Sequence, residues 1–151
     1  MRARMQNNMG NIWILGIDPG TNTGMAIRNV VTGDIEKLWT SNFWEAYHYA
    51  INNALCWRGV VVEVPDTKRV FHKAAGGLQQ IQRTAVRVGG VLREAELLAQ
   101  GIEQQNIPVL RVNPRGKINA EKFNSITGWK HKSNEHSRDA GMLTFMWRER
   151  A

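Results

Sequence analysis

The sequence has almost no cysteine and no long apolar run. Cys56 is the only cysteine, which excludes an internal disulfide and any cysteine-based zinc site. A single cysteine suits a reducing cytoplasm, which is the location we expect. No apolar segment approaches the ~20 residues that a membrane-spanning helix requires, so we expect no membrane partner.

Acidic residues are also scarce relative to basic ones. Lysine and arginine number 20, and aspartate and glutamate number 13, which gives a formal charge of +7 and a pI near 10.1. Such an excess of positive charge is typical of proteins that bind polyanions. Nucleic acid is therefore the first candidate partner.

The chain lacks internal repeats and any stretch with the composition of a linker. Its 151 residues have the length of one domain, which buries roughly 68–70% of the surface of the extended chain. We expect a single domain over residues 12–151. Residues 1–11 are polar and carry Arg2 and Arg4, and no signal-peptide core follows them, so we expect a flexible basic arm.

The apolar stretch at residues 12–17 is the strongest structural signal. Its length and its β-branched residues are typical of a strand that is buried on both faces. The run ends at Asp18, and Pro19 and Gly20 favour a tight turn directly after it. Asp18 is therefore expected at an edge of the sheet, where it either caps its own turn or meets other functional groups.

Apolar patterns divide the rest of the chain into strands and helices. The first three strands are expected to form an antiparallel meander, because only short turns separate them. Gly89 and Gly90 interrupt the longest helical pattern, which indicates either a close approach by another element or a kink. Further strands are expected at residues 25–31, 35–40, 60–64 and 107–112, and helices at 42–56, 75–105, 120–127 and 133–149. These elements predict an α/β fold.

Two more acids lie where site residues are expected. Glu63 is near the end of the apolar strand 60–64, which Pro65 terminates. In the last predicted helix, Asp139 belongs to a stripe that should face the sheet. The stripe consists of His136, Asp139, Ala140, Leu143, Met146 and Trp147. Asp139 has the alternative role of complementing the helix dipole.

Three carboxylates at one place would repel one another. At about 4 Å, each like-charge pair costs on the order of 4 kcal/mol at an effective dielectric constant of 20. A divalent cation removes that cost, and oxygen ligands favour Mg²⁺ or Mn²⁺. Asp18, Glu63 and Asp139 therefore predict a metal site, and two ions there would suit hydrolysis of a phosphodiester bond.

Basic residues gather in three predicted loops. Contacts with phosphate are one interpretation, and ordinary solvated loops are the alternative. The first of these loops also contains an aromatic residue, which could stack on a base. The DNA-binding candidates are Lys68, Arg69, Phe71, Lys73, Arg115, Lys117, Lys130 and Lys132.

Three motifs, in this order, resemble those of one known family. They are Gly16-Ile17-Asp18-Pro19-Gly20 with Thr23-Gly24, then Val62-Glu63-Val64-Pro65, and then His136-Ser137-Arg138-Asp139-Ala140. They resemble the acidic motifs of RuvC-type Holliday junction resolvases of the RNase H-like superfamily, and the resemblance extends over about residues 12–147. It implies an RNase H-like fold with a mixed five-stranded sheet and helices on both faces.

The same resemblance implies the activity and the partners. The chain is expected to be a Mg²⁺-dependent endonuclease that resolves four-way DNA junctions by paired nicking, in a bacterial or phage-infected cell. Resolvases of this kind act as homodimers, and we expect a two-fold interface on the long helix around Gly89 and Gly90. No nucleotide cofactor is expected.

The resemblance also assigns roles to individual residues. Asp18, Glu63 and Asp139 would be metal ligands. The fourth ligand would be His136, in preference to the adjacent Glu135. Lys122 would place a positive charge at the scissile phosphate, and Lys117 is the second candidate for that role.

Other interpretations of these residues remain open. A related nuclease, such as an RNase H or a transposase-like enzyme, would use the same carboxylates on a different nucleic acid. Residues 18–24 also resemble the phosphate-binding hairpin of actin and sugar-kinase ATPases, although those proteins need a second lobe. A basic junction-binding protein without catalytic activity is a further alternative.

Overall fold

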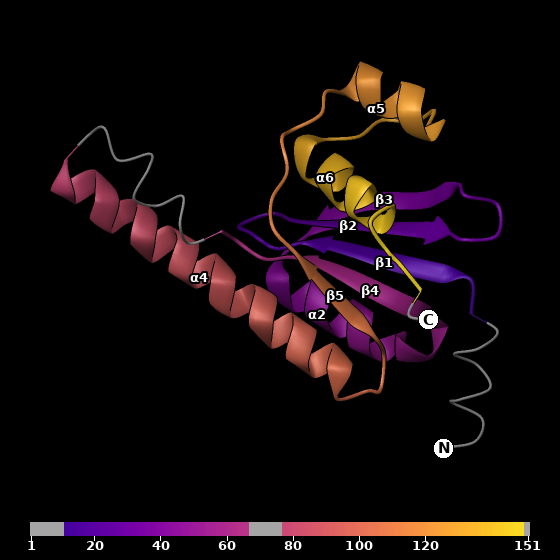
Figure 1. The fold of residues 1–151 in the computed structure, drawn as a ribbon, viewed down its shortest axis with the longest axis horizontal. Coiled ribbons are helices and arrows are strands. Elements are labelled where there is room, and N and C mark those ends of the chain that lie inside the picture. Colours follow the sequence, from indigo (N-terminus) through magenta and orange to yellow (C-terminus); the bar gives the residue numbers. More distant parts are fainter. Residues whose placement is uncertain (1–10, 67–76, 150–151) are drawn as a thin grey trace.

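The structure, a computed structural model, describes residues 11–66 and 77–149. Within these residues the chain is an α/β protein built on a five-stranded mixed sheet (Figure 1). None of the described helices has the length and apolar character needed to cross a membrane. The predicted DNA contacts of Lys68, Arg69, Phe71 and Lys73 lie outside the described residues, as does nearly all of the predicted basic arm.

The sheet has the strand order β3-β2-β1-β4-β5. Strands β1 (Trp13–Asp18), β2 (Thr23–Asn29) and β3 (Ile35–Ser41) form an antiparallel meander. Strands β4 (Trp57–Glu63) and β5 (Val109–Val112) continue the sheet on the other side of β1 and run parallel to it. The predicted meander is confirmed.

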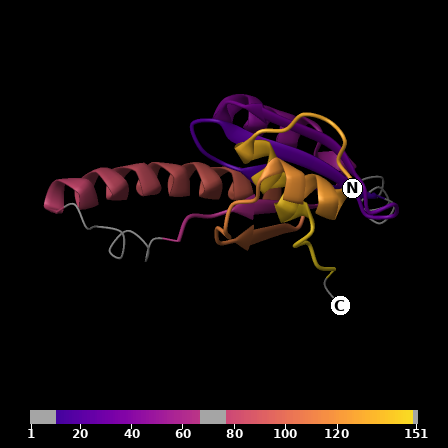
Figure 2. The ribbon, with the colours of Figure 1, turned by 90° about the horizontal axis from the view of Figure 1, so that it is seen from above.

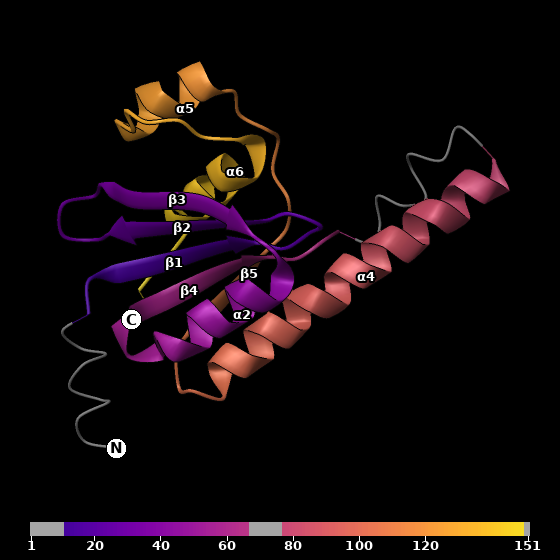
Figure 3. The same cartoon turned by 180° about the vertical axis from the view of Figure 1, so that it is seen from behind.

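Helices cover both faces of this sheet. Helix α6 (Glu135–Thr144) lies on the face seen in Figure 1, and α5 (Ala120–Thr127) lies beyond it. Helix α2 (Phe43–Asn52) and the carboxyl-terminal part of α4 (Leu78–Glu103) cover the opposite face, seen in Figure 3. The rest of α4 extends well beyond the sheet (Figure 2).

The predicted end of the last helix, at residue 149, is wrong. Helix α6 ends at Thr144, whose carbonyl oxygen accepts hydrogen bonds from Nε and Nη2 of Arg28 at 3.2 and 2.9 Å. Arg28 comes from β2, and its cation satisfies a carbonyl that the helix itself leaves free. The chain then turns away, so Trp147 packs against the sheet from outside the helix.

The close approach predicted at Gly89 and Gly90 is also wrong within this chain. Helix α4 continues unbroken through both residues, and a Cβ atom added to either would meet nothing within 4 Å. The buried residues of α4 all lie nearer its carboxyl end, starting at Ala95. The two glycines are therefore on an open part of the helix.

The side chains of the central strands alternate between two separate cores. Leu15 and Ile17 of β1, with Val62 of β4, belong to the larger core under α2 and α4. Ile14 and Val61 point the other way, into a smaller core under α6. This alternation follows from the two-residue period of a strand. The same alternation determines to which face of the sheet each later side chain of β1 and β4 points.

Glycines allow α6 to lie directly on the sheet. A Cβ atom at Gly16 of β1 would come within 2.3 Å of the Ala140 carbonyl oxygen, and one at Gly24 of β2 within 2.0 Å of the His136 carbonyl oxygen. Both obstacles are backbone atoms, which cannot move aside as a flexible side chain can. The positions of α6 and of the acid it carries therefore depend on these two glycines.

We expect Gly16→Ala to destabilise the protein by about 1–3 kcal/mol or more, since the new methyl group must push α6 off the sheet. For a chain of this length each kcal/mol lowers the melting temperature by about 2–4 °C. Gly116→Ala is the matched control, because a Cβ atom there meets nothing within 4 Å. Thermal melts of the two variants that coincide would contradict this account of the packing.

Candidate active site

Asp18 and Glu63 lie side by side at the carboxyl ends of two neighbouring strands. Strands β1 and β4 are parallel, and Ile17 pairs with Val62 immediately before the two acids. By the alternation along each strand, Asp18 and Glu63 both point to the face that carries α6. Their carboxyl groups are close enough for hydrogen bonding between them to raise the pKa of Asp18. The predicted convergence of these two acids is therefore present in the structure.

Helix α6 brings the third acid to the same edge. Its contact with Gly16 is made by Ala140, so Asp139 lies next to the point where the helix touches β1. The helix begins with a capping box, in which the Asn134 side chain accepts a hydrogen bond from the Ser137 backbone at 2.9 Å. The amino-terminal turns are thus held in place, and Asp139 lies close enough for its charge to act on Asp18 and for the charge of Glu63 to act on it.

Burial and the neighbouring acids raise the pKa of two of these carboxyl groups, Asp18 and Asp139. Burial, then the hydrogen bond and charge of Glu63, then the charge of Asp139 raise the pKa of Asp18 to about 9. Burial and the charge of Glu63 also raise the pKa of Asp139, while the charges of Lys117, His136 and Arg138 oppose that shift. A carboxyl group that resists ionisation in this way is short of positive charge.

The donor set fits a hard divalent cation. Two carboxyl groups this close need a proton on one of them, and a divalent cation held by Asp18 and Glu63 would supply positive charge in place of that proton. All three acids supply oxygen ligands, which is the preference of Mg²⁺ and Mn²⁺. Among the described residues, no three His, Cys, Asp or Glu side chains are grouped closely enough to hold an ion as they stand.

The two candidates for a fourth ligand have different surroundings. The charge of His136 acts on Asp139, which places its imidazole on the side of the acids. Glu135 forms an ion pair with Lys117 instead, and 43% of its side chain is exposed. The geometry thus favours His136 over Glu135 as the residue available to the three acids.

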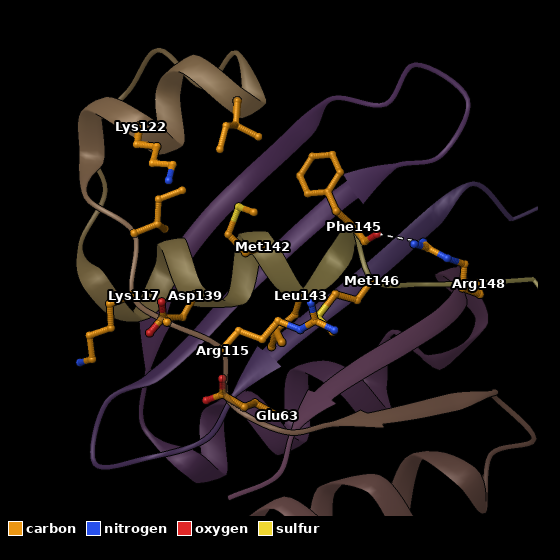
Figure 4. A pocket seen from close by; sticks show the side chains of 13 residues that line it. Glu63, Arg115, Lys117, Lys122, Asp139, Met142, Leu143, Phe145, Met146 and Arg148 are labelled. Atoms are coloured by element: carbon orange, nitrogen blue, oxygen red, sulfur yellow. Dashed lines mark hydrogen bonds between the residues drawn. The ribbon is translucent and has the colours of Figure 1, made fainter. Parts of the chain in front are cut away.

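A groove of about 600 Å³ begins at two of the acids and runs along α6 (Figure 4). Glu63 and Asp139 lie at one end of it, and Arg148 lies at the other. Most of the remaining wall comes from α5, α6 and the loop that connects β5 to α5. Its labelled apolar side chains are Met142, Leu143, Phe145 and Met146, and Ile126 also lines it.

Three predicted phosphate-binding residues line this groove, and two lie elsewhere. Arg115, Lys117 and Lys122 are all in its wall. Of these, Lys117 is the cation whose charge lowers the pKa of both Asp18 and Asp139. Lys130 instead lines a separate hollow beside the start of β3.

Lys132 is exposed in the same loop as Lys130. The Lys132 carbonyl oxygen accepts a hydrogen bond from Nε1 of Trp129 at 3.3 Å, which ties this loop to itself. Lys130 and Lys132 therefore do not belong to the walls of the groove that holds the acids.

Arg138 is a functional residue that the sequence reasoning missed. Its Nε donates to the Ile118 carbonyl oxygen at 3.0 Å, and its Nη1 donates to Ser133. It thereby fastens the loop that carries Lys117 to the helix that carries Asp139. The position of Arg138 beside Asp139 in the sequence indicated that it lies near the site. Its hydrogen-bond partner Ile118 lies 20 residues away, so the sequence did not indicate this contact.

The apolar residues of the groove were also not predicted, because the groove is formed by segments that are distant in the sequence. Met146 belongs to the stripe that was expected to face the sheet, and Met142 does not, yet both side chains are half-buried and line the groove. No family model matches the sequence of this chain, and no curated protein matches it.

The raised pKa of Asp18 predicts how stability depends on pH when divalent metal is removed with a chelator. An unfolded aspartate has a pKa near 3.9, whereas the folded value is about 9. Between these values the folded state holds a proton that the unfolded state has lost, so stability falls as pH rises. We expect the melting temperature to decrease from pH 5 to pH 8.

Asp18→Asn should remove most of that decrease, because the amide has no proton to lose. Asp34→Asn is the control, since Asp34 is an exposed acid in the turn before β3. Thermal melts at several pH values measure both variants. A wild-type stability that is flat over this range would show that Asp18 is ionised in the folded, metal-free protein.

Proposed function

We propose that this chain is a divalent-metal-dependent endonuclease with an RNase H-like fold, and that it cuts four-way DNA junctions. One observation carries the proposal. Asp18, Glu63 and Asp139 come from three distant segments and interact at one edge of the sheet. Bringing three acids together, one of them buried, is costly, and such a cost is typical of functional sites.

The sheet supports the RNase H-like part of this proposal. A three-strand antiparallel meander followed by parallel strands, with helices on both faces, is the arrangement that the sequence resemblance implies. The three motifs lie on β1, β4 and α6 of this arrangement. The fold alone would not define a reaction, which is why the carboxylates carry the argument.

The chain's own groups can be given roles in hydrolysis. Asp18, Glu63 and Asp139, with His136, would hold the metal ions. When bound, Mg²⁺ or Mn²⁺ would neutralise the phosphate, activate the attacking water and stabilise the leaving 3′ oxygen. Lys117 stands where it can bind a phosphate oxygen at the acids, and Arg138 holds its loop in place.

Lys122 is the alternative cation for the scissile phosphate. It lies in the first turn of α5, whose Asn119 cap accepts a hydrogen bond from the Lys122 backbone at 2.8 Å. Its side chain points into the groove in Figure 4. The two lysines flank the same groove, so both can contact one strand of DNA.

A four-way junction has two equivalent strands to cut, which calls for two active sites and hence a homodimer. Helix α4 offers a surface for a second copy of the chain. Val86 is 75% exposed, Leu97 is 46% exposed, and Gly90 between them leaves the backbone accessible. Trp44 of α2, which is 60% exposed, lies beside this stripe and lines a hollow with Gly90 and Leu97.

The charges on α4 suit a two-fold antiparallel pairing. Glu94 has a buried oxygen, Oε2, without a hydrogen-bond partner among the described residues. In a pairing centred between Gly90 and Val91, Arg87 of a second copy would lie opposite Glu94. The symmetric contact would form at the same time, because a two-fold interface is self-complementary.

The proposed chemistry predicts the effect of removing each acid. Asp18→Asn, Glu63→Gln and Asp139→Asn should each reduce Mg²⁺-dependent cleavage of a synthetic junction at least about 100-fold, since each loses a metal ligand. Binding of the junction should remain within about threefold, because phosphate contacts come from the basic residues. Gel assays of cleavage and of binding measure the two effects separately.

Asp34→Asn is the control for removing one negative charge away from the site, and its cleavage rate should equal that of the wild type. An RNA–DNA hybrid and a plain duplex should be tested beside the junction. Faster cleavage of the hybrid would favour an RNase H activity. Junction binding without cleavage of any of these substrates would instead favour a non-catalytic junction-binding protein.

The homodimer predicts a concentration-dependent mass in sedimentation. Wild-type protein should be dimeric at micromolar concentration, and Val86→Asp should be monomeric because it places a charge in the apolar centre of the interface. Val31→Asp is a closely matched control, since Val31 is 74% exposed at the turn after β2. A wild-type monomer that still resolves junctions would overturn the interface and the need for it.

A further inference from the structure

The groove beside the acids has an apolar wall that metal binding does not use. Met142 follows Asp139 by one helical turn, so the two side chains share a face of α6. Met146 and Phe145 continue the wall beyond the end of the helix. Ile126 of α5 lines the same groove. Ile126 is 54% exposed, so much of its apolar surface is available for contact.

The wall is held in position by charged residues. The guanidinium group of Arg28 lies 4.7 Å from the centre of the Phe145 ring and also binds the end of α6. Arg148 donates from Nη1 to the Phe145 carbonyl oxygen at 3.1 Å. These contacts leave Phe145 little freedom, so the wall is formed before any ligand arrives.

Positive charges stand at the rim of the same groove. Arg115 and Lys122 flank its middle, and Arg148 lies at the end away from the acids. An apolar surface edged by cations suits a group with a flat, weakly polar face and phosphates on either side. A nucleotide has that composition, and the groove volume of about 600 Å³ lies within the range of small-ligand sites.

We propose that this groove binds an unstacked nucleobase next to the scissile phosphate. The inference rests on the proposed nuclease function, because the acids at one end of the groove fix where that phosphate lies. The neighbouring nucleotide then falls against Met142, Met146 and Ile126. A base inside a continuous duplex is stacked and cannot enter, whereas an unpaired base at a branch point can.

The groove selects for an unpaired base and not for a particular base. Methionine and isoleucine side chains offer dispersion contacts to any base, and methionine adapts its shape to what it meets. The polar side chains of the wall are lysines and arginines, which are suited to bind phosphate, and the acids of the site, which are suited to bind metal. Each active site would then itself select for branched DNA, in addition to the selectivity that comes from the geometry of a dimer.

The test compares two DNA ligands that differ at one position. A 2-aminopurine is placed beside the proposed cleavage point, unpaired at a branch in one DNA and paired within a continuous duplex in the other. Binding is measured with the full-length protein in chelator, so that no cleavage occurs. We expect about tenfold tighter binding of the unpaired form and protection of its fluorescence from acrylamide.

The double variant Ile126→Gln with Met146→Gln should lose that preference and that protection. Leu55→Gln is the control, because Leu55 is 47% exposed and lies in the short 3-10 helix Ala54–Cys56 that follows α2, away from the groove. Circular dichroism establishes that both variants are folded. If the double variant retains the tenfold preference, the groove does not bind the base and the inference is overturned.

Separate cleavage assays distinguish this inference from the proposed function. Mg²⁺-dependent cleavage that the double variant performs with unchanged selectivity would overturn the base-binding groove alone. A preference for the unpaired base that depends on the groove, without cleavage of any DNA, would overturn the hydrolytic function alone. Failure to bind either DNA would overturn both.

Discussion

The contact between α6 and the sheet is the constraint on which the site depends. A helix normally stands off a sheet by the length of two layers of side chains. Here Gly16 and Gly24 remove one of those layers, and the carbonyl oxygens of Ala140 and His136 take its place. The helix backbone therefore approaches the strands closely enough for Asp139 to interact with acids that end the strands themselves.

That closeness has an electrostatic cost. Asp18 is buried beside Glu63, and the resulting shift of its pKa to about 9 means that ionising it in the folded state is unfavourable. Lys117 lowers this cost but does not remove it. A protein selected for stability alone would gain by replacing such a pair with apolar residues. Retaining the acids is understandable if a cation completes the site.

Much of this site could be predicted from local patterns. Asp18 and Glu63 are marked by the apolar runs before them and the prolines after them, and the parallel strands follow from the helical segments in between. Asp139 was found from the period of its helix. These signals are local in sequence, and the arrangement of the strands and of α6 in the structure is consistent with each of them.

The errors and omissions come from contacts between distant residues. Helix α6 ends early because Arg28, 116 residues away, binds its last carbonyl oxygen. Gly89 and Gly90 indicated a close contact, yet the close approach of α6 to the sheet is made at Gly16 and Gly24. A glycine in a strand is equally compatible with a turn, a bulge or a close contact, so its partner has to be seen in three dimensions.

The two faces of the sheet divide the work of folding and function. The larger core, under α2 and α4, contains most of the buried apolar residues, whereas the smaller core under α6 is formed by Ile14, Val61, Leu143 and Trp147 with partly buried neighbours. Because burial of apolar surface is the main stabilising term, the first face can supply most of the folding free energy. The second face can then contain glycines, unfavourable charges and an open groove. The three acids of the candidate site and the proposed base-binding surface all lie on this second face.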